Sequence, residues 1–333
     1  MSAFAAVTAP AAMSAESAVL AEAAMFPEAA MGKAYTVLAL ALGVATFIPE
    51  FRSLHNLGNI ATQSAALGIL AVGQTFVVLC GLIDLSVGQL TSLIVVLACD
   101  VMAGRASMAG PAVLLALGLG VGTGAVTGLL HNRLRIHSLI LTFGMMSVLQ
   151  GAVFTYTDRS VGRVSPAIAW LADGRLLGVP VALLLIVALA TLGHLALTRT
   201  RFGLHVYAVG GNPDNARRAG IDTAGIALAA FVISGFTAGI AGLLVAGRLG
   251  TGYPHAGAGF ELDAIVAVVL GGTSLAGGRG SIPATLAAVL LLGLTNNVLN
   301  LLQISSFIQM LLKGLIVIGA ILINQPLRRS APA

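Results

Sequence analysis

The chain has 333 residues, of which 58% are hydrophobic and only 9% are charged. A soluble domain carries roughly 25% charged residues, so this composition excludes a protein whose surface faces water on all sides. The formal net charge is +5, but the basic residues are scattered between apolar runs and not gathered on one polar face, which argues against nucleic-acid binding. The composition therefore predicts an integral membrane protein with lipid around much of its surface.

Residues 1–32 are rich in Ala and contain no basic residue, which a secretory signal would need ahead of its apolar core. We expect this stretch to be a cytoplasmic extension that is either disordered or a short surface helix. The membrane domain follows at 33–327, and residues 328–333 are expected to form a cytoplasmic tail.

Charged residues divide the membrane domain into apolar runs of about the 17–25 residues that a helix needs to cross a bilayer. The first eight runs lie at 33–50, 59–80, 85–104, 108–130, 136–157, 179–198, 224–247 and 262–275. The last stretch, 280–327, is too long for one helix, and its polar residues predict a turn near 301–306. The predicted fold is an all-α polytopic bundle of about ten transmembrane helices, in which the short first, third and eighth runs are tilted, interrupted or re-entrant.

Lys and Arg in short connections indicate which side faces the cytoplasm. They occur in the turn 131–137, the loop 199–222, the segment 271–281 and the tail, while arginines on the opposite side are partly balanced by acids. This bias predicts that both termini face the cytoplasm. The longest outside connection is then 158–178.

Four short stretches stand out by their order and spacing. They are GLIDLSVG at 81–88, YAVGGN with ARRAGI at 207–221, ELDAI with GGTSLAGGRGS at 261–281, and NNVLNLL at 296–302, followed by Ser305-Ser306-Phe307 and Lys313-Gly314. Together they resemble the permease family of bacterial ABC importers for ribose and related monosaccharides, which is related to the branched-chain amino-acid permeases. The resemblance covers about residues 35–325, and Leu82 stands where the family usually has a second glycine.

The resemblance implies a transport subunit of the bacterial inner membrane and not an enzyme. A second permease subunit, expected as a homodimer, would complete the pathway, cytoplasmic ABC ATPase subunits would supply energy, and a periplasmic sugar-binding protein would deliver the cargo. The only two lysines, Lys33 and Lys313, fit no phosphate-binding G-x-x-x-x-G-K-[ST] loop, so ATP hydrolysis requires a separate chain. We expect no cofactor and no metal, because Cys80 and Cys99 lack metal-site spacing.

Three other classes of protein are weighed against this reading. A branched-chain amino-acid permease would share the architecture, although the segments 81–88 and 271–281 favour sugars. An ion-coupled secondary transporter would need buried acids at mid-membrane, and the runs contain few. A membrane-embedded enzyme would need a catalytic constellation, which the sequence does not offer.

The segment 81–88 places a carboxylate and a hydroxyl between two glycines, and a lone carboxylate at membrane depth usually faces protein or water. It is either a broken-helix element at the pathway or its gate, or an ordinary cytoplasmic turn in which Asp84 caps the next helix. The same alternatives hold for 271–281, which resembles it weakly when Gly81 is aligned with Gly271. The gate candidates are Gly81, Asp84, Ser86, Gly88, Gly271 and Gly272.

The loop 199–222 is the longest predicted cytoplasmic connection between spans. An Asn-Pro-Asp sequence beginning at Asn212 is typical of a helix start, and Gly220 would end that helix. A short helix between spans can transmit rigid-body motion from a partner, although the arginines here could serve only to hold the loop in the cytoplasm. The predicted ATPase-coupling element consists of Asn212, Asp214, Arg217, Arg218 and Gly220.

Six polar side chains inside the runs could hydrogen-bond either sugar hydroxyls or neighbouring helices: Gln63, Gln74, Gln150, Asn296, Asn297 and Asn300. An interhelical hydrogen bond of this kind contributes about 0.6 kcal/mol in a membrane. The three asparagines, which fall within the last family-like stretch, are kept as pathway candidates.

Overall fold

The computed structural model describes Gly43, Phe51, 53–305, Ile308, Gln309, Leu311 and Gly314. The predicted extension 1–32, the tail 328–333, both lysines and nearly all of the first apolar run lie outside the described residues, as does most of the stretch beyond the predicted turn.

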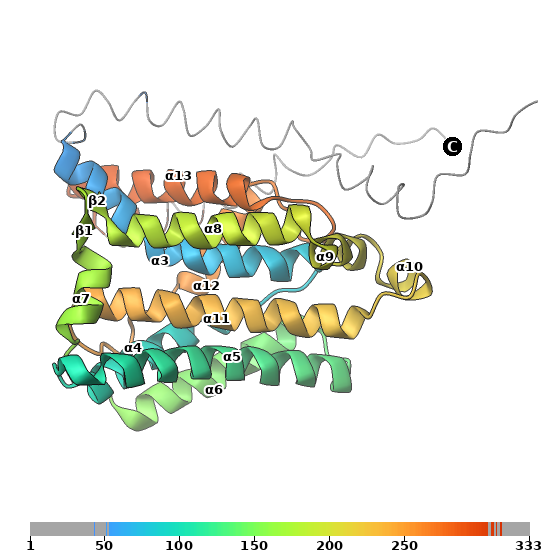
Figure 1. Cartoon of the computed structure of the whole chain (residues 1–333), viewed down its shortest axis with the longest axis horizontal. Helices are drawn as coiled ribbons and strands as arrows, with labels where there is room; N and C mark the ends of the chain where they lie inside the picture. Colours follow the sequence, from blue (N-terminus) through green and yellow to red (C-terminus); the bar gives the residue numbers. More distant parts are fainter. Residues whose placement is uncertain are drawn as a thin grey trace, which may run out of the picture.

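Long helices lying side by side make up most of the described chain (Figure 1). The bounds of the seven longest are α3 Leu54–Leu79, α4 Val87–Met102, α5 Ala109–Leu134, α6 Ser138–Tyr156, α8 Val181–Arg199, α11 Thr223–Leu249 and α13 Ile282–Leu301. Shorter elements are η2 Ala106–Met108, α7 Pro166–Asp173, α9 Arg201–Gly211, α10 Pro213–Arg218 and α12 Phe260–Leu270. Six of the described helices (α3, α5, α6, α8, α11 and α13) are long and apolar enough to cross a membrane. The predicted all-α membrane fold is therefore confirmed.

The two ends of the bundle carry different small elements (Figure 1). One end, which we call the α10 end, holds α9 and α10. The opposite α7 end holds α7 and a hairpin of β1 Arg175–Leu176 and β2 Val179–Pro180, paired antiparallel with Arg175 opposite Pro180. Leu177 and Gly178 both have positive φ in the two-residue turn, as the tight hairpin turn requires.

The closest helix contact joins α5 to the central helix α11. Gly120, Gly124 and Gly128 repeat every fourth residue and form one buried stripe on α5. A Cβ atom on Gly124 would lie 2.8 Å from the carbonyl carbon of Phe231, and one on Gly235 would lie 2.9 Å from that of Gly120. Glycine is needed here because the two backbones touch, as in other small-residue helix interfaces in membranes.

The outer helix faces are apolar. Leu114 on α5, Ile140 on α6 and Leu192 on α8 expose 73%, 64% and 64% of their side chains. The buried core lies instead between α3, α4, α11 and α13, where Ile69, Leu70 and Ile94 are completely covered. Apolar residues on both the inside and the outside are the arrangement expected when lipid surrounds the bundle.

The predicted runs from 59–80 to 224–247 each contain one long helix, with ends that differ by a few residues. The predicted turn near 301–306 is also confirmed, because α13 ends at Leu301. In the run 262–275 only α12 is helical, and with 11 residues and a rise of about 16 Å this helix is too short to cross a membrane alone. Two stretches expected as loops contain helices: α7 lies in 158–178, and α9 lies in 199–222.

Candidate functional site

A left-handed glycine ends α3 and turns the chain into the bundle. Gly81, which follows the C-cap Cys80, has a φ of +75°, a conformation that favours glycine. Its amide donates to the carbonyl of Val78 at 2.9 Å, and the amide of Leu82 donates to that of Val77 at 3.0 Å. The last carbonyl groups of the helix are satisfied in this way before the chain continues toward α4.

Asp84 is 2% exposed, and its carboxylate accepts three hydrogen bonds. Ser86 donates through its amide at 2.9 Å and its hydroxyl at 2.6 Å, and Ser234 of α11 donates through its hydroxyl at 2.8 Å. Gln74 of α3 binds the main chain of Asp84: with the amide oriented to suit the network, its nitrogen lies 3.3 Å from the carbonyl oxygen and its oxygen 3.2 Å from the amide nitrogen.

This network lies inside the bundle and not in an exposed turn. Ser234 is the twelfth residue of α11, about 16 Å from the start of that helix. The N-cap of α4 is Ser86, whose side chain makes no capping bond, and the Asp84 carboxylate accepts from the Ser86 amide directly ahead of this helix. Asp84 thus satisfies an amide at the helix start, but from a buried position and not from an exposed turn. Residues 81–86 form an irregular break between α3 and α4, in which Asp84 and Ser86 are buried.

The segment after α12 repeats the helix end seen at Gly81. The amide of Gly272 donates to the carbonyl of Val269 at 2.9 Å, that of Thr273 donates to Val268 at 3.1 Å, and Gly272 has a φ of +85°. Gly81 therefore corresponds to Gly272, and the sequence alignment with Gly271 was wrong by one residue. Gly271 itself makes a close contact, since its Cβ would lie 2.7 Å from the backbone of α13.

The first turn of α4 also meets the start of α12. Gly88 packs against the chain leading into α12, so a Cβ atom there would overlap the carboxylate of Glu261 and lie 2.8 Å from the carbonyl oxygen of Gly257. The amide of Gly257 donates to the hydroxyl of Ser92 at 2.9 Å. The N-termini of two short helices thus face each other inside the protein, with one carboxylate between them.

At the α10 end, three segments distant in the sequence meet through their backbones. The amide of Gly278 donates to the carbonyl of Leu79 at 2.9 Å, and Gly210 of α9 packs directly on the same two residues. The Tyr207 hydroxyl donates to the carbonyl of Gly280 at 2.9 Å. Burial raises the pKa of Tyr207 to about 12, so the hydroxyl keeps the proton that it donates. We call this contact the glycine junction.

The predicted short helix is present as α10, which follows α9 directly. Asn212 is its N-cap and accepts from the amide of Asn215 at 2.9 Å, and Gly220 has a φ of +84°. Asp214 pairs with Arg217 at 3.6 Å, although both side chains are largely exposed. Arg218 lies in the last turn. The helix thus extends two cationic groups from the bundle, and the exposed ion pair adds little stability.

The asparagine candidates lie at the α7 end. Asn297 and Asn56 of α3 are buried and exchange two side-chain hydrogen bonds, of 2.9 Å and 2.8 Å. The side-chain oxygen of Asn296 is buried without a partner among the described residues. Asn300 is exposed and accepts from Gln309 at 2.9 Å. Asn297 therefore joins two helices, which is the role that the sequence left as the alternative to sugar binding.

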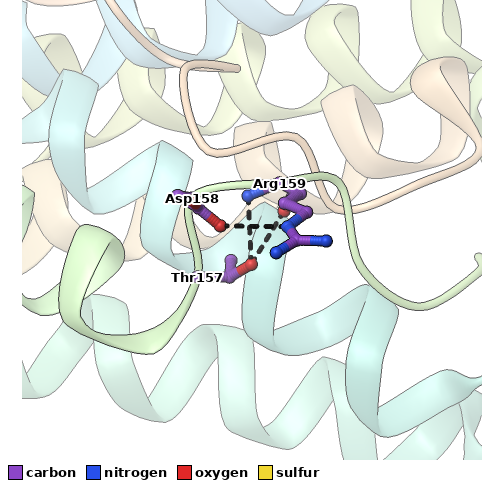
Figure 2. A network of polar contacts seen from close by, with 3 residues as sticks. All are labelled: Thr157, Asp158 and Arg159. Carbon is purple, nitrogen blue, oxygen red and sulfur yellow. Dashed lines mark hydrogen bonds and ion pairs between the residues drawn. The ribbon is translucent and has the colours of Figure 1, made fainter.

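The connection after α6 is held by local polar contacts (Figure 2). The hydroxyl of Thr157 lies 2.9 Å from the carbonyl oxygen of Arg159 and accepts from its amide at 3.2 Å. Arg159 pairs with Asp158 at 3.4 Å, with both side chains more than three-quarters exposed. A bridge between Val161 and Gly252 ties this connection to the chain that follows α11. These contacts shape a charged surface and form no enclosed site.

The structure separates the predicted site residues into three places. Gly81, Gly272 and α10 lie near the glycine junction, while Asp84, Ser86 and Gly88 lie inside the bundle, and the asparagines lie at the α7 end. The contacts of Ser234 with Asp84 and of Tyr207 with Gly280 were not predicted from the sequence. A single Ser or Tyr within a helix does not indicate which distant residue it will contact.

A family model described as the permease component of branched-chain amino acid transport systems matches residues 56–321. The ribose import permease protein of Escherichia coli (strain K12) is 41% identical over 293 residues, which cover 86% of this chain and 91% of that protein. The ribose import permease protein of Bacillus subtilis (strain 168) is 36% identical over 301 residues (89% and 92%). The L-arabinose transport system permease protein of E. coli (strain K12) is 33% identical over 303 residues (88% and 90%). No solved structure matches the chain significantly.

Proposed function

We propose that this chain carries a monosaccharide through the inner membrane while a separate ATPase supplies the energy. The chain belongs to this family of ABC-importer permeases. The observation that carries the proposal is the 41% identity to a ribose import permease, which extends over 86% of this chain. As a member of the family, the protein is a multi-pass inner-membrane protein and a transport component. The cargo is assigned from the names of the relatives, which include permeases for ribose and arabinose.

The proposed topology has about ten spans with both termini in the cytoplasm. It combines the six long helices, the shorter α4 and α12, and one further crossing at each end of the chain, in 33–50 and 306–327. The α10 end then faces the cytoplasm, in agreement with the arginines of the turn 131–137 and of α10. The α7 end faces the binding protein that delivers the sugar.

The proposed contact with the ATPase is α10. This helix is connected to α9 on one side and to the central helix α11 on the other, and α9 packs into the glycine junction. A displacement of α10 by a partner would therefore act on the ends of both broken segments at once. Arg217 and Arg218 would pair with acidic groups of the partner. A second copy of the chain completes the proposed pathway as a homodimer.

The function is tested by uptake into proteoliposomes that contain the permease, its ATPase and its binding protein. We expect ATP-dependent accumulation of labelled ribose, arabinose or allose that an excess of leucine leaves unchanged. Competition by leucine would favour the branched-chain amino-acid alternative. Uptake by the permease alone, without ATP, would favour an ion-coupled transporter.

The coupling role is tested by reversing the two charges of α10. The variant Arg217→Glu/Arg218→Glu should insert normally and lose at least about tenfold in uptake, because a charged pair buried against a partner contributes more than 1.4 kcal/mol. The matched control is Arg133→Glu/Arg135→Glu, which makes the same charge change in the other arginine-bearing turn of the α10 end. Equal uptake by the two double variants would reject a specific role for α10.

A further inference from the structure

Two adjoining hollows open the bundle at the α7 end. They have volumes of about 440 Å³ and 390 Å³ and share Thr62, Gln63 and Arg248 in their walls. Both volumes lie in the range of small-molecule sites. The walls come from α3, α7, the hairpin, the end of α11 and the chain leading into α12. We call the two hollows together the α7-end cavity.

Polar side chains line this cavity without using their hydrogen-bonding capacity on the protein. Within the part of the chain that the structure describes, the side chains of Asn59, Gln63, Tyr253 and His255 have no hydrogen-bond partner. An amide offers two donors and one acceptor oxygen, and a phenol or neutral imidazole offers both roles. Groups of this kind suit a ligand whose hydroxyls both donate and accept.

Aromatic and apolar groups line the second of the two hollows. The rings of Tyr253 and His255 lie 5.6 Å apart between centroids, and Phe260, the first residue of α12, lines the same hollow. A sugar ring has an apolar face of C–H groups, which packs on aromatic surfaces while its hydroxyls reach the polar wall. Asp173 interacts electrostatically with Arg248, so that Arg175 leaves the wall of the cavity with one positive charge in excess.

We infer that the α7-end cavity is the site at which the permease first binds the sugar, with Gln63, Arg248 and Tyr253 as its hydrogen-bonding contacts. This inference rests on the proposed function for the identity of the ligand, a neutral polyhydroxylated monosaccharide. The cavity lies at the end opposite α10, and Phe260 brings its inner wall next to Glu261, where the first turn of α4 packs on α12. Sugar in the cavity is thus separated from the α10 end by the buried breaks.

The first test replaces the shared amide in the complete transporter. With labelled ribose as the probe, Gln63→Leu should lower sugar uptake per ATP hydrolysed by about fivefold, the effect of one lost neutral hydrogen bond. ATP hydrolysis stimulated by the loaded binding protein should remain. The matched control is Gln150→Leu, because Gln150 is exposed on α6 outside the cavity walls. Its uptake should equal that of the unsubstituted protein.

A second measurement does not depend on transport activity. Both native cysteines are buried, so Gln63→Cys provides one accessible thiol for a small membrane-impermeant reagent. Ribose delivered by the binding protein should slow the labelling of this thiol several-fold, whereas leucine should not. The proposed site would be overturned if Gln63→Leu took up sugar normally and ribose did not change the labelling of Gln63→Cys. It would also be overturned if uptake were lost in Gln150→Leu but not in Gln63→Leu. Absence of sugar uptake by the unsubstituted complex would instead overturn the proposed function.

Discussion

Among the described glycines, Gly210 is the one at which an added Cβ atom would approach another backbone atom most closely. A Cβ atom there would overlap the carbonyl oxygen of Leu79, lie 2.9 Å from its carbonyl carbon and lie 2.5 Å from the amide nitrogen of Gly278. Both neighbours are backbone groups, joined by a 2.9 Å hydrogen bond. Neither can rotate away as a side chain could, so α9 must move as a whole.

Overpacking of this kind costs about 1–3 kcal/mol, and the backbone neighbours place Gly210→Ala near the upper end of that range. With about 2–4 °C of melting temperature per kcal/mol, we expect the midpoint of the purified protein to fall by roughly 6–12 °C. Uptake should fall more steeply than the amount of inserted protein, because the displaced helix is the one that precedes α10.

The next residue supplies the control for this prediction. Gly211 belongs to the same helix, and a Cβ atom on it would meet no atom within 4 Å. Gly211→Ala should leave uptake intact and raise stability by up to about 1 kcal/mol, because Ala restricts the unfolded chain more than Gly. The reasoning is refuted if both variants melt at the same temperature in detergent and transport at the same rate.

Two further predictions concern buried polar contacts. Asn297→Leu alone should destabilise the protein by about 1–3 kcal/mol, because it leaves the buried side-chain oxygen of Asn56 without a donor. Adding Asn56→Leu should recover part of that loss, and additive losses in detergent unfolding would contradict the pairing. Ser234→Ala should cost about 1–3 kcal/mol and reduce uptake, because it removes a donor from the Asp84 carboxylate. Ser147→Ala on the exposed face of α6 is its control, and equal melting temperatures of the two serine variants would count against the network.

The long helices could be predicted from the sequence because their signal is local. An apolar run of about 20 residues bounded by charges identifies a span by itself, and Asn212 with its Pro and Asp identified the start of α10. The helix α9 was missed because its 11 residues are too few for a membrane span and lie within a connection bounded by arginines. The end of α12 at Leu270 was also missed, because no charged residue interrupts the sequence between Leu270 and Arg279, although Gly271 and Gly272 follow the helix directly.

The geometry around Asp84 could not be predicted, because it depends on contacts between distant residues. Ser234 lies 150 positions along the chain from Asp84, and a serine in an apolar helix usually has no visible reason to be singled out. The α7-end cavity also depends on residues that are distant in the sequence. Its walls come from residues near 60, 175, 250 and 260, so no single motif describes it.

The two short helices explain why the breaks are buried. Helices α4 and α12 rise about 24 Å and 16 Å, so neither spans the roughly 30 Å hydrocarbon core alone. Irregular backbone at that depth is tolerated only where protein or a water-filled cavity covers it. Here Ile83 and Asp84 are contacted by α3, α6 and α11, through Gln74, Thr142 and Ser234. The carboxylate of Glu261 lies against the N-terminal turn of α4, where a negative group is favourable. A movement of α4 relative to α12 would disturb this contact, and we therefore propose the packing at Gly88 as the barrier between the α7-end cavity and the glycine junction.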